Sequence, residues 1–160
     1  MSKVAIYPGT FDPITNGHIE LITRSLRIFD EVIVAVAPSK KKDPLFTVEE
    51  RIKLIEQSVA KLKGARADSF DTLLMDYAEG TGSLAVVRGL RAVSDFEYEL
   101  QMALMNRRLN ANIETVFLMP SQEYTFLSST IVKEVFSFGG SVKGLVPAVV
   151  ERALTKKFNR

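Results

Sequence analysis

The sequence contains no cysteine, which excludes a disulfide framework and any metal site built from thiolates. It also lacks any apolar run approaching the ~18 residues that a membrane-spanning helix requires. Residues 1–3 lead directly into an expected strand, with no apolar segment of the signal-peptide kind. We therefore expect a soluble, cytoplasmic protein with no membrane partner.

A strong excess of charge of one sign is missing as well. The 21 Lys and Arg residues nearly balance the 19 Asp and Glu residues, which gives a formal net charge of +2. The basic residues are spread along the chain, so charge does not indicate a nucleic-acid partner. A length of 160 residues with 46% hydrophobic and 25% charged content is typical of one globular domain, assigned to residues 1–160.

Short apolar runs alternate with segments of helical periodicity. Strands are predicted at residues 4–6, 32–36, 65–70, 84–87 and 115–119. Helices are predicted after residue 17, at 47–64, near 73–78, over 93–109 and 129–138, and after residue 147. This alternation favours βαβ units with right-handed crossovers. The expected fold is α/β: a single-domain, doubly wound, five-stranded parallel sheet of the Rossmann-like kind, with C-terminal helices.

The helix expected at 93–109 carries two apolar stripes, although a surface helix needs only one. The first stripe contains Tyr98, Met102, Met105 and Leu109. The second, on roughly the opposite side, contains Phe96, Leu100, Ala103 and Leu104. One stripe is expected to cover the sheet of the same chain, and the other covers either a loop of this chain or a neighbouring subunit. We expect a homo-oligomer.

The turn at residues 7–20 joins the first strand to the first helix and has the features of a phosphate site. Its prolines and glycines allow the backbone to approach a ligand closely. His18, the only histidine, follows Gly17 in the first turn of the expected helix. Free N–H groups at a helix N-terminus suit phosphate. On spacing alone, however, a histidine in an amphipathic helix is more often structural.

Residues of suitable chemistry follow each expected strand, at 9–11, 40–42, 73–74, 88–91 and 124–129. In an open parallel sheet, ligands bind beyond the carboxyl ends of the strands, where the strand order reverses. If the order is 3-2-1-4-5, four side chains meet at the centre of that crevice: Thr10, His18, Arg88 and Arg91. The planar forks of the two arginines suit phosphate oxygens.

Some of these groups have an ordinary structural interpretation. The lysines at 40–42 could form a solvated loop, and residues 128–130 could simply cap a helix. The stretch at 80–85 matches Gly-x-Gly-x-x-Ala but precedes a strand, whereas a dinucleotide-binding fingerprint follows one, so we discard it. The sequence has no P-loop motif and no cluster of histidines and carboxylates suited to zinc.

Five segments, in order along the chain, carry a family resemblance. Gly-Thr-Phe-Asp-Pro at 9–13, followed by Thr-Asn-Gly-His at 15–18, is similar to the signature turn of the nucleotidyltransferase superfamily. The others are Phe-Thr-x-Glu-Glu-Arg at 46–51, Arg-Gly-Leu-Arg at 88–91, Asp-Phe-Glu-Tyr-Glu at 95–99 and Ser-Ser-Thr-Ile-Val-Lys at 128–133. Together they resemble the bacterial phosphopantetheine adenylyltransferases.

The resemblance implies an enzyme of coenzyme A biosynthesis that transfers the adenylyl group of ATP to 4'-phosphopantetheine, giving dephospho-coenzyme A and pyrophosphate. The acceptor phosphate would attack in line, without a covalent enzyme intermediate. The resemblance also implies Mg²⁺ with ATP, a homohexamer, and coenzyme A as a potential feedback ligand. Two alternatives stay open: another small-molecule nucleotidyltransferase, such as a nicotinamide-mononucleotide adenylyltransferase or a cytidylyltransferase, and a non-catalytic ATP-binding module.

The same resemblance implies roles for individual residues. The catalytic residues would be Thr10, His18, Lys42 and Arg91. The acceptor side would contain Thr10, Lys42, Leu74 and Arg88, with apolar cover for the pantetheine arm from Leu73, Leu74 and Met75. The nucleotide side would contain Thr10, Phe11, His18, Gly89, Leu90, Arg91, Glu99, Tyr124, Thr125, Phe126, Leu127, Ser128, Ser129 and Thr130. Lys133 is left outside the site, because the superfamily has arginine there and lysine offers no bidentate fork.

Overall fold

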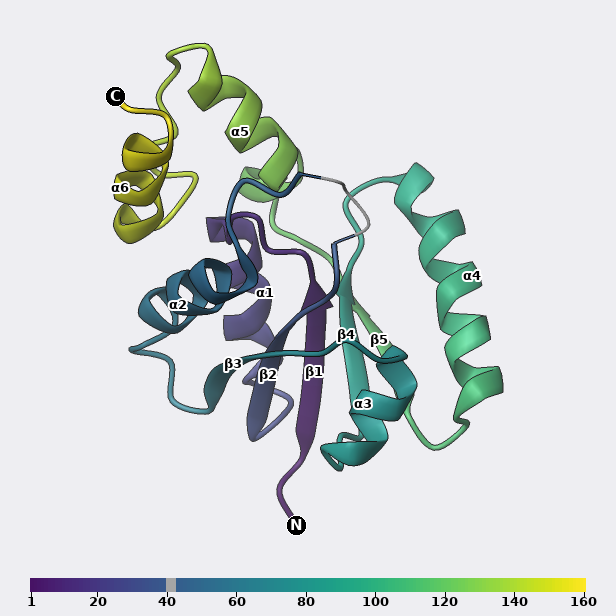
Figure 1. Ribbon diagram of the computed structural model, residues 1–160. Coiled ribbons are helices and arrows are strands. Elements are labelled where there is room, and N and C mark those ends of the chain that lie inside the picture. Colours follow the sequence, from purple (N-terminus) through teal and green to yellow (C-terminus); the bar gives the residue numbers. More distant parts are fainter. Residues whose placement is uncertain (40–42) are drawn as a thin grey trace.

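The computed structural model describes residues 1–39 and 43–160 and shows an α/β architecture (Figure 1). The strands are β1 (Val4–Gly9), β2 (Glu31–Val36), β3 (Ala65–Ser69), β4 (Ala85–Gly89) and β5 (Glu114–Leu118). The helices are α1 (Asn16–Ser25), α2 (Val48–Ser58), α3 (Leu74–Gly80), α4 (Val93–Leu109), α5 (Ser129–Ser137) and α6 (Ala148–Lys157), with a short 3-10 helix η1 (Gln122–Tyr124). All the predicted strands and helices are therefore present.

The strands form one parallel sheet in the order β3-β2-β1-β4-β5, which confirms the expected fold. β1 pairs with β2 along its whole length and with β4 at Ala5 opposite Ala85 and Ile6 opposite Val86. The chain moves outward from β1 in one direction and from β4 in the other. The strand order therefore reverses between β1 and β4, and the crevice expected from the sequence begins at their carboxyl ends.

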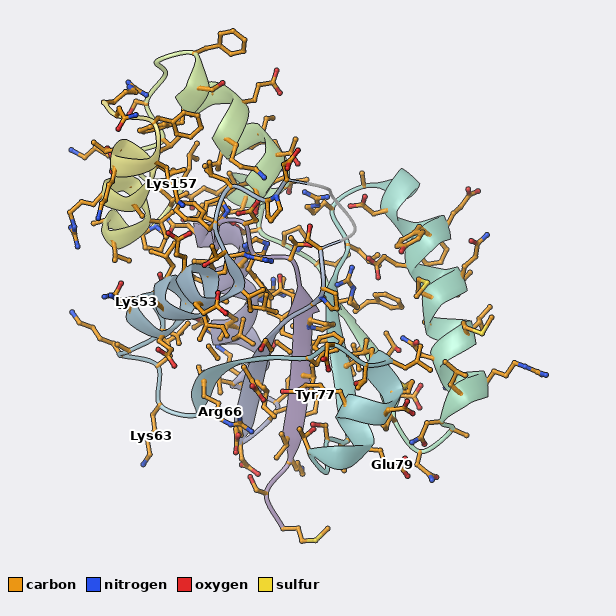
Figure 2. All side chains as sticks on the ribbon, viewed as in Figure 1. Lys53, Lys63, Arg66, Tyr77, Glu79 and Lys157 are labelled. Atoms are coloured by element: carbon orange, nitrogen blue, oxygen red, sulfur yellow. The ribbon has the colours of Figure 1, made fainter. Side chains whose placement is uncertain are left out.

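A hydrophobic layer on each face of the sheet holds the helices α1, α2, α3, α5 and α6. In β2, Val32 and Val34 belong to the layer that contains α1 and α2, whereas Ile33 and Ala35 belong to the layer that contains α3. Alternate residues of a strand point to opposite faces, so a continuous apolar run becomes a strand that is buried on both sides. Charged side chains such as Lys63 point outward (Figure 2). In the described part of the chain, no helix combines the length and the apolar character needed to cross a membrane.

Hydrogen bonds at the helix starts confirm two sequence-based predictions. The Thr47 hydroxyl accepts from the Glu50 N–H at 3.2 Å, and the Glu50 carboxylate accepts from the Thr47 N–H at 2.8 Å. This is the capping box predicted for α2. The Ser128 hydroxyl likewise caps α5 by accepting from the Ile131 N–H at 3.1 Å. Both contacts satisfy N–H groups that a helix start leaves without an internal partner.

α4 differs from expectation in the face that it turns inward. The side chains of Glu99 and Asn106 are buried, at 7% and 8% exposed. The large apolar side chains of both stripes lie at the surface, as shown by Tyr98 at 58% and Leu104 at 59% exposed. The prediction that one apolar stripe would cover the sheet was therefore wrong. The polar side of α4 between the two stripes, with Glu99 and Asn106, faces the rest of the protein instead, because Glu99 forms an ion pair with Arg88 of β4.

The turn between β1 and α1 is tied to two distant segments by the carboxylate of Asp12, which is only 3% exposed. This carboxylate accepts hydrogen bonds from the N–H groups of Leu45 and Phe46, each at 2.9 Å. It also forms an ion pair with the Lys133 ammonium of α5 at 3.0 Å. Asp12 therefore joins the turn to the chain that enters α2 and to α5.

The same contacts set the protonation state of Asp12. Burial alone would raise the pKa of its carboxyl, but the two N–H donors and Lys133 outweigh this effect and lower the pKa below its usual value of 3.8. A depressed pKa in the folded state means that the unfolded chain binds the proton more readily. The stabilisation is therefore present above the unfolded pKa and is lost as the pH falls through the folded pKa.

We expect Asp12→Asn to lower the free energy of unfolding at pH 7 by about 3 kcal/mol, the scale for breaking a buried ion pair. The difference from the wild type should shrink below about pH 4, because the unfolded wild-type chain then takes up a proton at Asp12, which offsets part of the stabilisation from the ionised folded carboxylate. Urea titrations at pH 7 and pH 3.5 measure both quantities.

Asp71→Asn, at an exposed aspartate, is the matched control and should change stability little at either pH. A loss for Asp12→Asn that stays the same at both pH values would contradict a contribution from the charge.

Candidate active site

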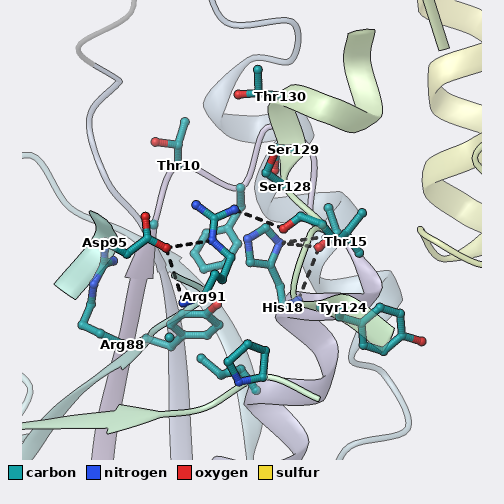
Figure 3. Close-up of a pocket in the computed structure, with 18 of the residues that line it drawn as sticks. Thr10, Thr15, His18, Arg88, Arg91, Asp95, Tyr124, Ser128, Ser129 and Thr130 are labelled. Atoms are coloured by element: carbon teal, nitrogen blue, oxygen red, sulfur yellow. Dashed lines mark hydrogen bonds and ion pairs between the residues drawn. The ribbon is translucent and has the colours of Figure 1, made fainter. Parts of the chain in front are cut away.

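A cleft of about 310 Å³ opens at the carboxyl ends of β1 and β4 (Figure 3). The residues that line it come from the turn after β1, the start of α1, the end of β4, α4 and the segment that leads into α5. The following residues expected in the site line this cleft: Thr10, Phe11, His18, Arg88, Gly89, Arg91, Glu99, Tyr124, Leu127, Ser128, Ser129 and Thr130. Segments far apart in sequence therefore converge as the strand order requires.

Several other expected residues are not among those that line this cleft. They are Leu74, Leu90, Thr125 and Phe126. Leu74 begins α3 and packs against the hydrophobic layer of that face, while Phe126 is 58% exposed. Lys42, expected to act on the acceptor phosphate, lies outside the described residues.

The cleft also contains residues that the sequence analysis did not place there, among them Tyr7, Asp12, Thr15, Asp95 and Lys133. Lys133 had been left out of the site, yet its ion pair with Asp12 holds it in the cleft wall. The sequence did contain an indication of this position, because Lys133 lies four residues after Ser129 and the two are therefore on the same side of a helix. The buried carboxylate partner could not be read from spacing.

The ring of His18 is oriented by the N-terminus of its own helix. Its Nδ1 accepts a hydrogen bond from the Thr15 N–H at 2.9 Å, so His18 occupies the position that glutamate has in an ordinary capping box. Since Nδ1 is an acceptor, the proton of the neutral imidazole lies on Nε2. The ring also packs edge-on against Phe11, with centroids 4.9 Å apart. His18 therefore presents an N–H donor from a fixed ring.

The electrostatic surroundings keep His18 neutral. Burial is the largest effect, and the positive charges of Arg91 and then Arg88 add to it, lowering the pKa of His18 to about 4. At neutral pH the imidazole is thus a hydrogen-bond donor without a charge. It is suited to stabilising charge that develops on a ligand, and it does not change its protonation state near pH 7, where a general acid or base would need to do so.

Phe11 depends on the glycine two residues before it. The backbone of Phe11 has φ of 48°, a left-handed conformation that a bulky residue rarely adopts. Its ring is 3% exposed and packs edge-on against Tyr7 at 5.2 Å. A Cβ atom at Gly9 would lie 3.0 Å from this ring, so a larger residue there would displace it. The glycine therefore makes room for the ring that supports His18.

Arg88, at the end of β4, joins this strand to β1 and to α4. Its Nε and Nη2 donate to the two carboxylate oxygens of Glu99 at 2.9 Å and 2.5 Å. Its Nη1 donates to the Pro8 carbonyl of β1 at 2.9 Å. A guanidinium has five N–H groups, so two stay available for a ligand. Arg88 is consequently both a structural link and a candidate anion contact.

Arg91 and Ser129 hold the turn after β4 and the start of α5 in place along the cleft (Figure 3). Arg91 donates from Nη1 to the Leu127 carbonyl at 3.1 Å and from Nε to Asp95 at 3.3 Å. The Ser129 hydroxyl donates to the Pro13 carbonyl at 2.6 Å. These contacts join the turn after β4 and the start of α5 to the turn after β1. The walls are thus held before any ligand binds.

The cleft carboxylates are already engaged by cations. Asp12 pairs with Lys133, Asp95 with Arg91 and Glu99 with Arg88. Within residues 1–39 and 43–160, no group of three or more His, Cys, Asp or Glu side chains is placed to hold a metal ion. The residues present do not form a dedicated metal site. The cleft chemistry instead favours an anionic ligand.

Solved structures confirm the fold. The chain is similar to a bifunctional NMN adenylyltransferase/ADP ribose pyrophosphatase from Francisella tularensis, in two structures with TM-scores of 0.71 and 0.72. One of them is complexed with AMP and a manganese ion. The match covers 100% of this chain but only 50% and 51% of those chains, at 15% identity. At this identity the likeness concerns the fold alone.

Sequence relatives are much closer and match over their full length. Residues 6–135 match the cytidylyltransferase-like family model. The phosphopantetheine adenylyltransferase of Thermodesulfovibrio yellowstonii is 60% identical, with 100% of both chains covered. That of Alkaliphilus oremlandii is 57% identical, with 98% of this chain and 99% of the relative covered. The chain therefore belongs to the phosphopantetheine adenylyltransferases, within the nucleotidyltransferase superfamily.

Proposed function

We propose that this protein transfers the adenylyl group of ATP to 4'-phosphopantetheine, releasing pyrophosphate and giving dephospho-coenzyme A. The observation that carries the proposal is the arrangement of one neutral imidazole donor, His18, beside two guanidinium groups, Arg88 and Arg91, in a single cleft. That arrangement suits a reaction in which one phosphate attacks another. The names of the full-length relatives support the choice of acceptor.

The main task of the protein in this reaction is alignment and charge stabilisation. The acceptor phosphate is already ionised near neutral pH, so no protein base is required. The Nε2–H of His18 would donate to an oxygen of the α-phosphate as negative charge builds there. Thr15 and Phe11 already hold the ring, so the donor needs no reorganisation during the reaction.

Four other residues would position the two phosphate groups. Arg91 and Ser129 would hold the triphosphate. Thr10, exposed in the cleft at the end of β1, would position the acceptor phosphate. Lys42 would neutralise that phosphate, a role that rests on the family resemblance alone. The nucleotide side would be formed by Phe11, Gly89, Leu90, Glu99 and residues 124–130. These roles are predictions for all of them, and Leu90, Thr125 and Phe126 are not among the residues that line the cleft.

The acceptor side would use the free N–H groups of Arg88 and the apolar start of α3. Leu73 is 59% exposed and Leu74 is partly buried, so either could cover a pantetheine arm. Met75 is 3% exposed within the hydrophobic layer. Its predicted role as cover was wrong, because the helical turn points its side chain into the core.

Magnesium is expected to accompany ATP, and the family uses a divalent metal in this way. Since the cleft carboxylates are paired with cations, we propose that the ion is held mainly by phosphate oxygens and water. Bound in that way, it would neutralise part of the triphosphate charge.

Feedback by coenzyme A and a cytoplasmic location stay predictions.

We also propose a homohexamer, with α4 in the subunit interface. Apolar side chains on α4 are exposed, including Met102 at 41%, Met105 at 52% and Leu109 at 51%. Exposed apolar surface of this extent on one helix marks an interaction site. Isologous or ring-forming contacts between identical chains would cover it.

His18→Ala should lower kcat by at least ~100-fold, the scale for losing one preorganised transition-state donor. ATP affinity should change comparatively little, because Arg91 and Ser129 remain in place. Steady-state kinetics and calorimetric ATP binding separate these two effects.

His18→Gln is the matched control for the fold, since glutamine at this position can also accept the Thr15 N–H and so preserve the capping box. It should unfold like the wild type and still lose kcat. Equal losses of ATP affinity and kcat in both variants would mean that His18 only binds ATP.

With ATP present, 4'-phosphopantetheine should release pyrophosphate, whereas pantetheine without its phosphate should be inert, because Thr10 and Arg88 would have no anion to hold. Nicotinamide mononucleotide should be a poor acceptor, since residues 73–75, which would cover the acceptor, include no aromatic ring for stacking. A pyrophosphate assay with the three compounds measures this.

Strong turnover with nicotinamide mononucleotide, together with none from 4'-phosphopantetheine, would favour a nicotinamide-mononucleotide adenylyltransferase. ATP binding without pyrophosphate release from any acceptor would favour a non-catalytic module.

Met105→Glu should shift the sedimentation mass at micromolar concentration toward smaller species, because it places a charge in the proposed interface. Ile28→Glu, at a residue of similar exposure (51%, against 52% for Met105) outside α4, is the control and should leave the mass unchanged. A monomeric wild type would end this proposal.

A further inference from the structure

Arg51 is a buried cation that the proposed chemistry does not use. Its side chain lies on the inner face of α2 and is 2% exposed. Among the residues that the structure describes, no carboxylate forms an ion pair with it. Burying a charge without a counter-ion is costly, and an apolar side chain of similar volume would avoid that cost. An arginine at this position therefore calls for a specific reason.

Within residues 1–39 and 43–160, the hydrogen bonds of Arg51 all go to backbone carbonyls. Its Nη1 donates to the Thr10 carbonyl at 2.9 Å. Its Nε is shared between the carbonyls of Phe46 at 3.1 Å and Thr47 at 3.3 Å. One planar guanidinium thus connects the end of the β1 segment to the start of α2, across 41 residues of sequence.

The Phe46 peptide is held from both sides. Its carbonyl accepts from Arg51, and its N–H donates to the Asp12 carboxylate at 2.9 Å. Asp12 lies two residues after Thr10 in the same turn. The contacts therefore run from Thr10 through Arg51 and Phe46 back to Asp12, and both ends of this path lie in the cleft. Movement of Thr10 would disturb hydrogen bonds at each step.

A purely structural role in starting α2 explains the arrangement less well. The capping box of Thr47 and Glu50 already serves the start of this helix. The bond to the Thr10 carbonyl adds nothing to the helix, but it fixes the backbone of a residue whose side chain is exposed in the cleft.

We propose that Arg51 is a positioning residue, which holds Thr10 at the distance and orientation needed to align the acceptor phosphate. The inference rests on the proposed adenylyl transfer. Arg51 itself is not among the residues that line the cleft, and its side chain is buried, so it acts without contacting a ligand. Its effect reaches the reaction through the Thr10 backbone.

Arg51→Met removes all three hydrogen bonds while keeping a long apolar side chain. A misplacement of about 1 Å in a reacting group can cost up to about 100-fold in rate. We therefore expect kcat with 4'-phosphopantetheine to fall by at least about 10-fold, while the Kd for ATP changes less than about 3-fold. Arg51→Lys, which can keep at most part of this network, should fall between the wild type and Arg51→Met.

Ile55→Ala is the control for lost stability. Ile55 lies on the same helix and is 0% exposed, so the substitution opens a cavity in the core without touching the Thr10 turn. All variants are assayed at a temperature where circular dichroism shows them folded. Ile55→Ala should keep a kcat within about 2-fold of the wild type. An equal loss of kcat in Ile55→Ala and Arg51→Met would overturn the proposal.

A double-mutant cycle on kcat distinguishes positioning of Thr10 from a purely structural role of Arg51. If Arg51 acts by positioning Thr10, adding Arg51→Met to Thr10→Ala should lower kcat by less than about 3-fold further, because the hydroxyl to be positioned is already gone. Losses that multiply in the double variant would overturn the proposal. If Arg51→Met does not fold, the same cycle is run with Arg51→Lys.

The outcomes also separate this inference from the proposed function. A wild type that releases no pyrophosphate with 4'-phosphopantetheine contradicts the function. An active wild type with full activity in Arg51→Met contradicts only the role of Arg51.

Discussion

The buried carboxylate of Asp12 is the contact on which the rest of the cleft depends. It lies in the turn after β1 and binds two N–H groups of the chain that enters α2, as well as the Lys133 ammonium of α5. These segments have no covalent reason to meet, since they are separated by 34 and 121 residues. A hydrophobic contact could bring them together, but it would not fix their angles. Hydrogen bonds and an ion pair shielded from water do so, because each has a narrow geometry and is costly to break.

The site then combines strong positive charge with a neutral histidine. Arg88 and Arg91 are both turned toward protein partners, a carboxylate each and a backbone carbonyl each. These partners hold the guanidinium groups in place, while their charges, together with burial, keep His18 unprotonated. A charged imidazole would bind the ground-state phosphates as well as the transition state. A neutral donor adds its stabilisation mainly as charge develops, and this difference lowers a barrier.

The parallel sheet, the capping box of α2 and most of the cleft could be predicted from the sequence, because these follow from local periodicity and from the rule on strand ends. The sequence alone left the strand order open, and the structure establishes it. Prediction from the sequence failed where one side chain depends on a distant partner. The spacing of Lys133 from Ser129 places it on the side of α5 that faces the cleft, but the ion pair that holds it there is not local, because its partner Asp12 lies 121 residues away. Met75 was expected to cover the pantetheine arm, but its side chain packs into the hydrophobic layer and is 3% exposed. The role of Arg51 was hidden in a motif that looked like an ordinary helix start.

The inward face of α4 shows how the site also shapes the outer surface. Hydrophobic periodicity favours turning one apolar stripe toward the sheet, and that choice would bury more apolar area. The bidentate pair between Glu99 and Arg88 requires the polar side of α4 to face inward instead. Both apolar stripes are then left exposed, and a single chain has nothing with which to cover them. The ion pair that holds Arg88 at the cleft is thus the same contact that leaves the apolar side chains of α4 at the surface. In the proposed homohexamer, site geometry and assembly would be linked through this one helix.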